Sequence, residues 1–384
     1  MRASSPPDGH FKHDPGPVLV LLVLSCVCGV VVSERELVYV TVLFPLTKGM
    51  QQHYNLGQFL RKKYAGFLKE RYDRHEISVR STDYDRTLMS AEANLAGLYP
   101  PNGSQVFNPN IKWQPIPVHT VPMSEERLLS FPLNDCPRYK KLMNETEQSE
   151  EFQMSLPHMK MSLSWVYDTL FCEAQHNKTA PDWVTPEVME KLKFLKDFAF
   201  QTMFGLYKQT EKSRLQGGML LGEIVKNLSA MAAEDPKPQL KLMMLSAHDT
   251  TVAALQASLN VFNGVQPPYA SCHIIELYKE ENGNYTVDMF YRNNTQLNQL
   301  QLPGCALQCP LEDFKALTKP SISDDRDQEC QLPSNGTNKD VIISLAVCGC
   351  LLFLLISILL FIICRQTEPM RTRGYHHVNI ESES

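Results

Sequence analysis

Three kinds of functional signal are missing from this 384-residue sequence. It contains no G-x-G-x-x-G stretch and no P-loop, which excludes the glycine-rich motifs that hold nucleotide phosphates. No cluster of Lys and Arg precedes its most apolar segment, and the formal net charge is −5, so no nucleic-acid partner is indicated. No His-x-His spacing and no second pair of closely spaced cysteines supports zinc. The sequence therefore indicates no metal and no other cofactor.

A long run without charged residues lies near the C-terminus, over residues 341–364. As a helix its 24 residues would extend about 36 Å, because each residue adds about 1.5 Å. A hydrocarbon core is roughly 30 Å thick, so this run predicts one transmembrane helix. Arginines follow it within residues 365–384, whereas Lys339 and Asp340 on the other side cancel. The excess of positive charge places the C-terminal tail in the cytoplasm.

A shorter apolar run, from Val18 to Val32, lies near the N-terminus. It follows Arg2 and Lys12 and is too short to span a bilayer comfortably, which is typical of a signal peptide. Residues 1–33 are therefore interpreted as a signal peptide, and residues 34–340 as a domain that faces a lumen or the exterior.

Sequons and cysteines are distributed as this topology requires. N-x-S/T sequons occur in the predicted lumenal domain and not in the tail, which favours glycosylation at Asn102, Asn144, Asn177, Asn227, Asn284, Asn293 and Asn335. Outside the signal peptide and the membrane segment the cysteines are Cys136, Cys172, Cys272, Cys305, Cys309 and Cys330. In an oxidising compartment an even number of cysteines favours disulfide bridges, and scattered buried thiols are the alternative.

Strand-like and helix-like patterns alternate along this domain. The stretch from Glu36 to Phe44 is β-rich and almost continuously apolar, as a strand covered on both faces would be. The patterns that follow predict helices over 50–68, 85–100 and about 185–234 with a break at Gly217–Gly218, strands over 76–83 and 115–123 and from Lys241, and a hairpin over 272–293 that turns at Asn282–Gly283. This alternation predicts an α/β fold with a central sheet.

Two strands of the expected sheet end in side chains that suit an anion. One carries Arg80 near its end, the other is followed by His248 and Asp249, and a helical pattern begins directly after each. Ligands of α/β sheets bind beyond the carboxyl ends of the strands, where helix N-termini converge, so these groups predict a phosphate site. Two alternatives stay open at this point. Arg80 could pair with Asp83 or Asp85, and the His-Asp pair could be an ordinary helix cap.

Longer stretches resemble the histidine acid phosphatases. The resemblance covers most of residues 36–330 and is carried by VRSTDYDRTLMSAEANLAGLYPPNG, WQPIPVHTVP, YDTLFCE, RLQGG, SAHDTTVAALQ, PYASCHIIELY and LPGC. It implies a phosphoglycerate-mutase-like α/β sheet flanked by helices, and hydrolysis of phosphate monoesters at acidic pH through a phosphohistidine intermediate. By the same resemblance, Arg80 and His248 bind the phosphate, and Asp249 protonates the leaving oxygen.

The resemblance carries further expectations about protonation, disulfides and sorting. His248, with a reference pKa near 6.5, is expected to be cationic in an acidic lumen and to hold phosphate better in that state. The tail stretch RGYHHV resembles a Tyr-x-x-Φ sorting signal formed by Tyr375 and Val378, which implies delivery to the lysosome membrane and lumen by sorting adaptors. Other expected partners are small phosphate monoesters, a membrane crossed once in type I orientation, and a second copy in a homodimer. The implied bridges are Cys136–Cys330, Cys172–Cys272 and Cys305–Cys309.

The chain departs from the family in two places. The motif R-H-G-x-R-x-P, which supplies a nucleophilic histidine and two arginines after the first strand, is absent, and Phe44 is followed directly by Pro45. His53 lies in the next helical pattern, turned away from the strand end, and His75 precedes the second strand, so neither is expected to reach phosphorus in line. Helical material of the cap is skipped after Gln153, which predicts a reduced cap. Because loss of a nucleophile costs about 10⁶ in turnover, catalysis is expected to be impaired. A non-catalytic glycoprotein that at most binds phosphorylated ligands is the alternative.

Overall fold

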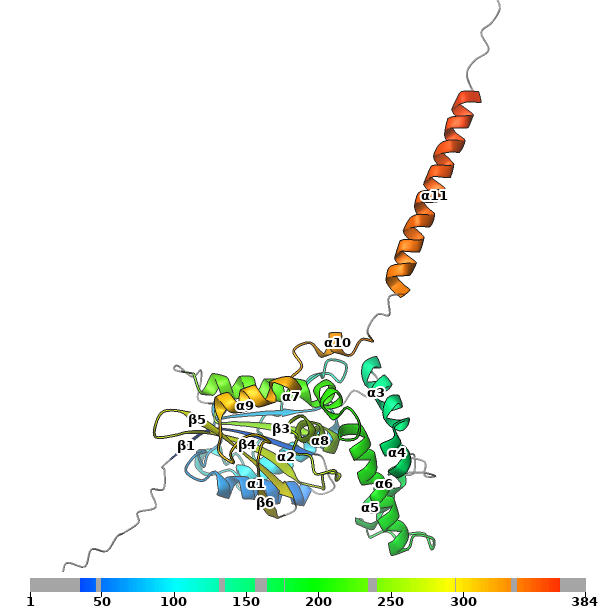
Figure 1. Cartoon of the computed structure of the whole chain (residues 1–384). Coiled ribbons are helices and arrows are strands. Elements are labelled where there is room, and N and C mark those ends of the chain that lie inside the picture. The colour runs from blue at the N-terminus through cyan, green and yellow to red at the C-terminus, as the bar shows by residue number, and fades with distance from the viewer. Residues whose placement is uncertain are drawn as a thin grey trace, which may run out of the picture.

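The computed structural model describes residues 35–45, 50–130, 135–155, 164–175, 177–233, 240–293, 295–332 and 337–366. The predicted signal peptide, Asn335 and the predicted sorting residues Tyr375 and Val378 lie outside the described residues. In the described part, a mixed sheet carries helices on both faces, further helices stand beside it, and one long helix projects away (Figure 1). The predicted α/β class, a sheet flanked by helices, is confirmed.

The sheet has the strand order β2-β3-β1-β4-β5-β6, and β7 pairs with β5. Its strands are β1 (Glu36–Pro45), β2 (Ile77–Ser81), β3 (Leu242–Ala247), β4 (Cys272–Lys279), β5 (Tyr285–Asn293), β6 (Gln296–Leu300) and β7 (Cys309–Pro310). The central strand β1 pairs in parallel with β3 and antiparallel with β4. Its residues from Tyr39 to Pro45 are buried, because both faces of the sheet are covered. The strand predicted from Glu36 is confirmed.

Helices cover the two faces of the sheet and create two separate apolar layers. They are α7 (Gln209–Met231), α8 (Asp249–Ser258) and α9 (Leu311–Thr318) on one face, and α1 (Met50–Lys63) and α2 (Asp85–Leu98) on the other (Figure 1). Leu43 belongs to the first layer and the next residue, Phe44, to the second, as the two-residue period of a strand requires. The face on which a side chain of this sheet lies therefore decides which groups it can meet.

The long helical stretch predicted before β3 is two helices, α6 (Pro186–Phe204) and α7. The break lies between them, where Tyr207 and Lys208 have φ angles of 50° and 48°, so its prediction at Gly217–Gly218 was wrong. Gly217 lies inside α7, where that helix packs closely on α8. A Cβ atom at Gly217 would lie 2.4 Å from the carbonyl oxygen of Ala254. This glycine is needed for helix packing, which sequence pattern alone confuses with a helix end.

The strand predicted over residues 115–123 was also wrong. Only His119 pairs there, in an isolated bridge with Arg80 at the outer edge of β2. Three prolines in this segment lack the N–H group that a sheet ladder requires. The predicted β4–β5 hairpin is confirmed, and its turn contains Gly283 with a φ of 83°, an angle that glycine adopts without strain.

Four helices lie together beside the sheet (Figure 1). They are α3 (Pro137–Glu147), α4 (Glu150–Ser155), α5 (Ser164–Gln175) and α6. Phe152, Leu170 and Leu195 bring α4, α5 and α6 into one apolar cluster. Short elements complete the domain: η1 (Gly103–Gln105), η3 (Lys319–Ser321) and α10 (Arg326–Glu329).

The last helix, α11 (Thr337–Gln366), contains the predicted membrane span. Its segment Val341–Arg365 has a mean hydropathy of 3.2, and none of its most apolar window is buried against the rest of the protein. The helix is therefore long and apolar enough to cross a membrane, and no contact with the domain explains its composition.

Two of the three expected disulfides are present. Cys136–Cys330 joins the start of α3 to the end of α10, and Cys305–Cys309 closes a short loop. The expected bridge between Cys172 and Cys272 was wrong for this structure, because both residues are free cysteines. Their thiols have different surroundings. Cys272 is buried in the apolar layer under α1 and α2, whereas Cys172 lies on α5 with its sulfur 2.9 Å from the hydroxyl oxygen of Tyr269.

The described sequon asparagines differ in exposure. Asn227 and Asn293 are half-buried, and the exposed ones are Asn102, Asn144, Asn177 and Asn284. The side-chain amide of Asn227, whose nitrogen would carry a glycan, donates to Glu223 at 3.4 Å. The four exposed asparagines are therefore the better placed acceptors.

Candidate functional site

The carboxyl ends of β2, β3 and β1 lie side by side and bring the two predicted motifs together. Ser246 of β3 pairs with Ser81 on one side and with Phe44 on the other. Directly beyond these pairs, the hydroxyl oxygen of Thr82 lies 3.2 Å from Nε2 of His248. The segment after Arg80 therefore touches the His-Asp segment, as the topology rule for parallel strands predicts.

His248 is also the N-cap of α8, so the cap interpretation left open by the sequence is correct. Its backbone carbonyl accepts a hydrogen bond from the backbone N–H of Thr251 at 3.0 Å, and the hydroxyl of Thr251 accepts one from the N–H of His248 at 3.3 Å. The ring of Tyr84 packs edge-on against the imidazole, with 5.1 Å between the ring centres. The imidazole is thus held at the helix N-terminus by Thr82 and Tyr84, which both come from the segment that follows β2.

Burial changes the expected protonation of His248. Desolvation lowers the pKa of this side chain, the positive charge of Arg86 lowers it further, and the negative charges of Asp249 and Glu126 oppose the shift. The direction is the reverse of the one that would favour a cationic ring in an acidic lumen. Burial therefore opposes the cationic ring that was expected from the reference value of a solvated side chain.

Asp249 is the first residue of α8, and both of its carboxylate oxygens accept hydrogen bonds. The backbone N–H of Thr250 donates to Oδ1 at 2.8 Å, and the side-chain amide of Gln266 donates to Oδ2 at 2.7 Å. The backbone N–H of Gln266 in turn donates to Asp197 on α6, at 3.0 Å. Gln266 links the expected proton donor to the helices beside the sheet. Sequence analysis missed it, because an uncharged amide in a proline-rich loop carries no recognisable signal.

Arg80 pairs with Glu126 and with neither of the partners considered from the sequence, Asp83 and Asp85. Its Nη2 atom lies 3.0 Å from both carboxylate oxygens of Glu126. Oε1 of Glu126 also accepts the backbone N–H groups of Leu128 and Leu129, at 2.8 Å each. Because the carboxylate is buried and held by these bonds, the loop that contains it brings a fixed negative charge to Arg80.

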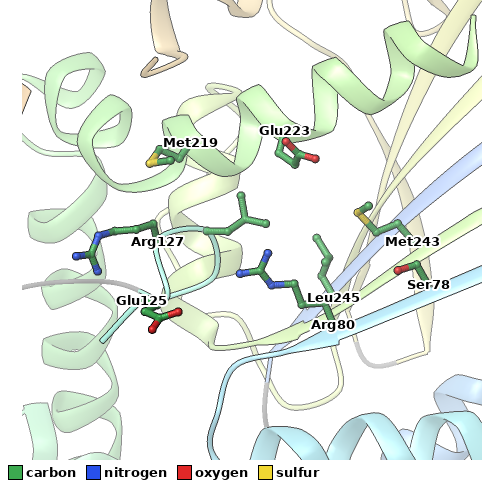
Figure 2. Close-up of a pocket in the computed structure, with 9 residues that line it drawn as sticks. Ser78, Arg80, Glu125, Arg127, Met219, Glu223, Met243 and Leu245 are labelled. Atoms are coloured by element: carbon green, nitrogen blue, oxygen red, sulfur yellow. The ribbon is translucent and has the colours of Figure 1, made fainter. Parts of the chain in front are cut away.

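A cavity of about 470 Å³ lies next to this ion pair, between the sheet and α7 (Figure 2). Figure 2 shows the Arg80 guanidinium directed into the space below α7, with Met219 and Glu223 on the helix above it. The lining residues are Ser78, Arg80, Glu125, Arg127, Leu128, Met219, Glu223, Met243 and Leu245. The positive charges of the two arginines in the lining are balanced by the negative charges of its two glutamates. Glu126, which pairs with Arg80, adds a third negative charge. This cavity therefore lacks the excess positive charge that a phosphate site requires.

Of the two histidines weighed as substitute nucleophiles, neither faces the site. His53 is fully buried, and its ring centre lies 5.3 Å from that of Phe44, so it is closer to the end of β1 than expected. It lies in the layer under α1, on the face of the sheet opposite to Arg80. Desolvation lowers its pKa to about 4. His75 is exposed at the amino end of β2, the far edge of the sheet, as predicted.

Two further histidines near Arg80 were not considered as substitute nucleophiles in the sequence analysis. His273 of β4 is in register with Leu43, which is in register with Leu245 and thereby with Arg80. Adjacent strands are about 4.8 Å apart, so the Cα atoms of Arg80 and His273 are separated by about 14 Å, with two leucines between them. His119 is exposed on the outer side of β2, away from His248. Among the described residues, therefore, no histidine lies at the mouth of β1 between Arg80 and His248.

Comparison with known proteins identifies the family. The profile of the histidine phosphatase superfamily (branch 2) matches residues 39–166 and 159–292. Human lysosomal acid phosphatase is 54% identical over 354 residues, covering 87% of this chain and 82% of that protein. Bovine prostatic acid phosphatase is 48% identical over 314 residues, covering 77% and 80%. The phytase of Klebsiella sp. ASR1 shares the fold, with a TM-score of 0.56 at 14% identity over 78% of this chain and 98% of the phytase. The resemblance seen in the sequence is confirmed, and this chain belongs to the histidine phosphatase superfamily, branch 2.

Proposed function

We propose that this chain is by descent an acid phosphatase, built to hydrolyse phosphate monoesters at acidic pH through a phosphohistidine, in a form whose catalysis is impaired. One observation carries the proposal: Phe44 and Pro45 continue β1 without interruption, paired with Ser246 and Ala247 of β3. The family places its nucleophile at this point of the chain, and no histidine of the described residues occupies it.

The residues that are present support half of the reaction. In this proposal Arg80 and His248 contact phosphate oxygens and Asp249 protonates the leaving oxygen. The contact of Thr82 with His248, directly after the Arg80 strand, and the hydrogen bond from Gln266 to Asp249 support it. Such groups stabilise the spreading negative charge and supply a proton. Without a nucleophile and its two arginines, about 10⁶ in turnover is expected to be lost.

The test is a gain of function. The full chain, purified in detergent, is expected to hydrolyse an aryl phosphate negligibly near pH 5 and to trap no phosphoenzyme. Insertion of a family segment with R-H-G-x-R-x-P between Phe44 and Pro45 is expected to restore both signals, and His248→Ala in that inserted form to abolish them. Robust turnover by the unmodified chain would refute the nucleophile argument. His119→Ala, which removes the exposed imidazole nearest to Arg80, would then show whether that ring had taken the role.

The alternative is a non-catalytic glycoprotein that binds phosphorylated ligands through Arg80 and His248. The balanced charges around Arg80 argue against strong binding. Replacement of Glu126 by Gln removes one of them, so inorganic phosphate is expected to bind the unmodified chain weakly and the E126Q variant at least about tenfold more tightly. Tight phosphate binding by the unmodified chain in calorimetric titration would favour the alternative.

The same proposal includes topology and destination. Residues 1–33 are a signal peptide, 34–340 a glycosylated lumenal domain, 341–364 a membrane span, and 365–384 a cytoplasmic tail whose Tyr375 signal recruits adaptors for lysosomal delivery. The lysosomal relatives and the apolar helix α11 support this arrangement. Protease added to sealed vesicles is expected to remove only the tail, and a glycosidase is expected to act only after the vesicles are opened. Digestion of the domain in sealed vesicles would contradict the orientation.

A further inference from the structure

Two acidic side chains lie directly opposite each other in the β4–β5 hairpin. Glu276 and Asp288 are paired residues of adjacent strands, and both side chains are buried. Like charges at paired positions of a sheet repel each other, and burial strengthens the repulsion. Both groups therefore stay ionised in the folded domain only where a cation lies beside each carboxylate.

Glu276 obtains its partners from within the domain. Lys63 at the end of α1 lies 3.0 Å from Oε1, the hydroxyl of Tyr64 donates to Oε1 at 2.7 Å, and the hydroxyl of Tyr278 donates to Oε2 at 2.8 Å. These contacts come from the last residue of α1, from Tyr64 directly after it and from β4, so they are present wherever the fold is present.

Asp288 depends on the first described residue of the chain. Both terminal nitrogens of Arg35 donate to its carboxylate, Nη1 to Oδ1 at 3.3 Å and Nη2 to Oδ2. The guanidinium also lies 3.8 Å from the centre of the Tyr278 ring and 3.8 Å from Oε1 of Glu280. Burial raises the pKa of Asp288, and Arg35 opposes that rise. Among the described residues, no other cation lies within ion-pair distance of Asp288.

We propose that Arg35 is an N-terminal latch that the mature protein must retain, and that the leader is therefore cut on the amino side of Arg35. The cut is hydrolysis of one peptide bond: water adds across it, and the mature chain gains a new α-ammonium group. β1 begins at Glu36 and the predicted leader ends at Ser33, so a shift of two residues would remove the latch. Asp288 would then be buried without a cation beside Glu276, which is strongly unfavourable.

Mass spectrometry of the full chain, recovered from cells and deglycosylated, gives the first residue of the mature protein. The expected start is Arg35 or a residue before it. A folded, protease-resistant protein that begins at Glu36 or later would overturn the proposal.

Variants test the latch independently of the cut. Arg35→Gln is expected to lower the melting temperature by roughly 5 °C or more, and Arg35→Lys by much less. The double variant Arg35→Gln/Asp288→Asn is expected to melt close to Asp288→Asn alone, because the charge that needs Arg35 is gone. Arg74→Gln, at an exposed arginine, is the matched control and is expected to change nothing. The stabilising role of Arg35 would be refuted if the Arg35→Gln protein melted like the unmodified chain. It would also be refuted if the double variant melted well below Asp288→Asn alone. If Arg35→Gln is not recovered at all, recovery of the double variant decides in its place.

Discussion

Replacement of His273 by Leu is expected to make the folded domain about 2 kcal/mol less sensitive to acid between pH 8 and pH 5. His273 is almost fully buried in β4, and among the described residues neither of its ring nitrogens has a hydrogen-bond partner. Desolvation therefore lowers its pKa to about 4, whereas the unfolded chain has the reference value of about 6.5.

The direction in which stability changes with pH follows from the folded and unfolded pKa values of His273. Because the folded pKa lies below the unfolded one, the unfolded chain binds the proton first as the pH falls. His273 therefore does not change the free energy of unfolding with pH above about pH 7.5. Stability is lost progressively as the pH falls from about 6.5 to 4. The loss is about 2 kcal/mol at pH 5 and about 3 kcal/mol below pH 4, at about 1.4 kcal/mol per pKa unit. His53, buried with a pKa of about 4, is expected to add a similar loss.

The assay is urea unfolding of the detergent-purified full chain at pH 8 and pH 5, followed by tryptophan fluorescence. The measured quantity is the difference in unfolding free energy between the two pH values, so any loss of stability that the Leu side chain causes equally at both pH values cancels. His75→Leu, at an exposed histidine, is the matched control and should leave the difference unchanged. The reasoning fails if His273→Leu shows the same difference as the unmodified chain.

Two other replacements test the packing of the fold. Gly217→Ala places a methyl group 2.4 Å from the carbonyl oxygen of Ala254 and is expected to cost about 1–3 kcal/mol. Gly222→Ala in the same helix meets a single side-chain methyl group, Cγ2 of Ile322 at 3.0 Å, and should lower the melting temperature less. Equal melting temperatures would contradict the close approach of α7 and α8. Removal of the Cys136–Cys330 bridge, whose cysteines are 194 residues apart, is expected to cost about 5 kcal/mol, and removal of the bridge with a separation of 4 about 2 kcal/mol. Equal losses in urea unfolding would contradict the loop-entropy argument.

Features that depend on neighbouring residues could be predicted from the sequence. Consecutive residue types are enough to predict the apolar strand β1, the Asn-Gly turn of the hairpin and the apolar span within α11. Simple topology then places the ends of β2 and β3 at one edge of the sheet, which brings the segment after Arg80 into contact with His248. The missing nucleophile is also a property of the sequence, because no R-H-G stretch occurs in it.

Tertiary structure alone decided which groups surround those residues. The partner of Arg80 is Glu126, 46 positions away, because a proline-rich loop folds back across the sheet edge. The pKa direction of His248 depends on its burial, and the orientation of Asp249 depends on Gln266. Gly217 resembles a helix end until α8 is seen packed against it. These outcomes could not be predicted because desolvation, ion pairing and helix packing depend on distances between residues far apart in the chain, whereas sequence patterns report mainly on neighbours.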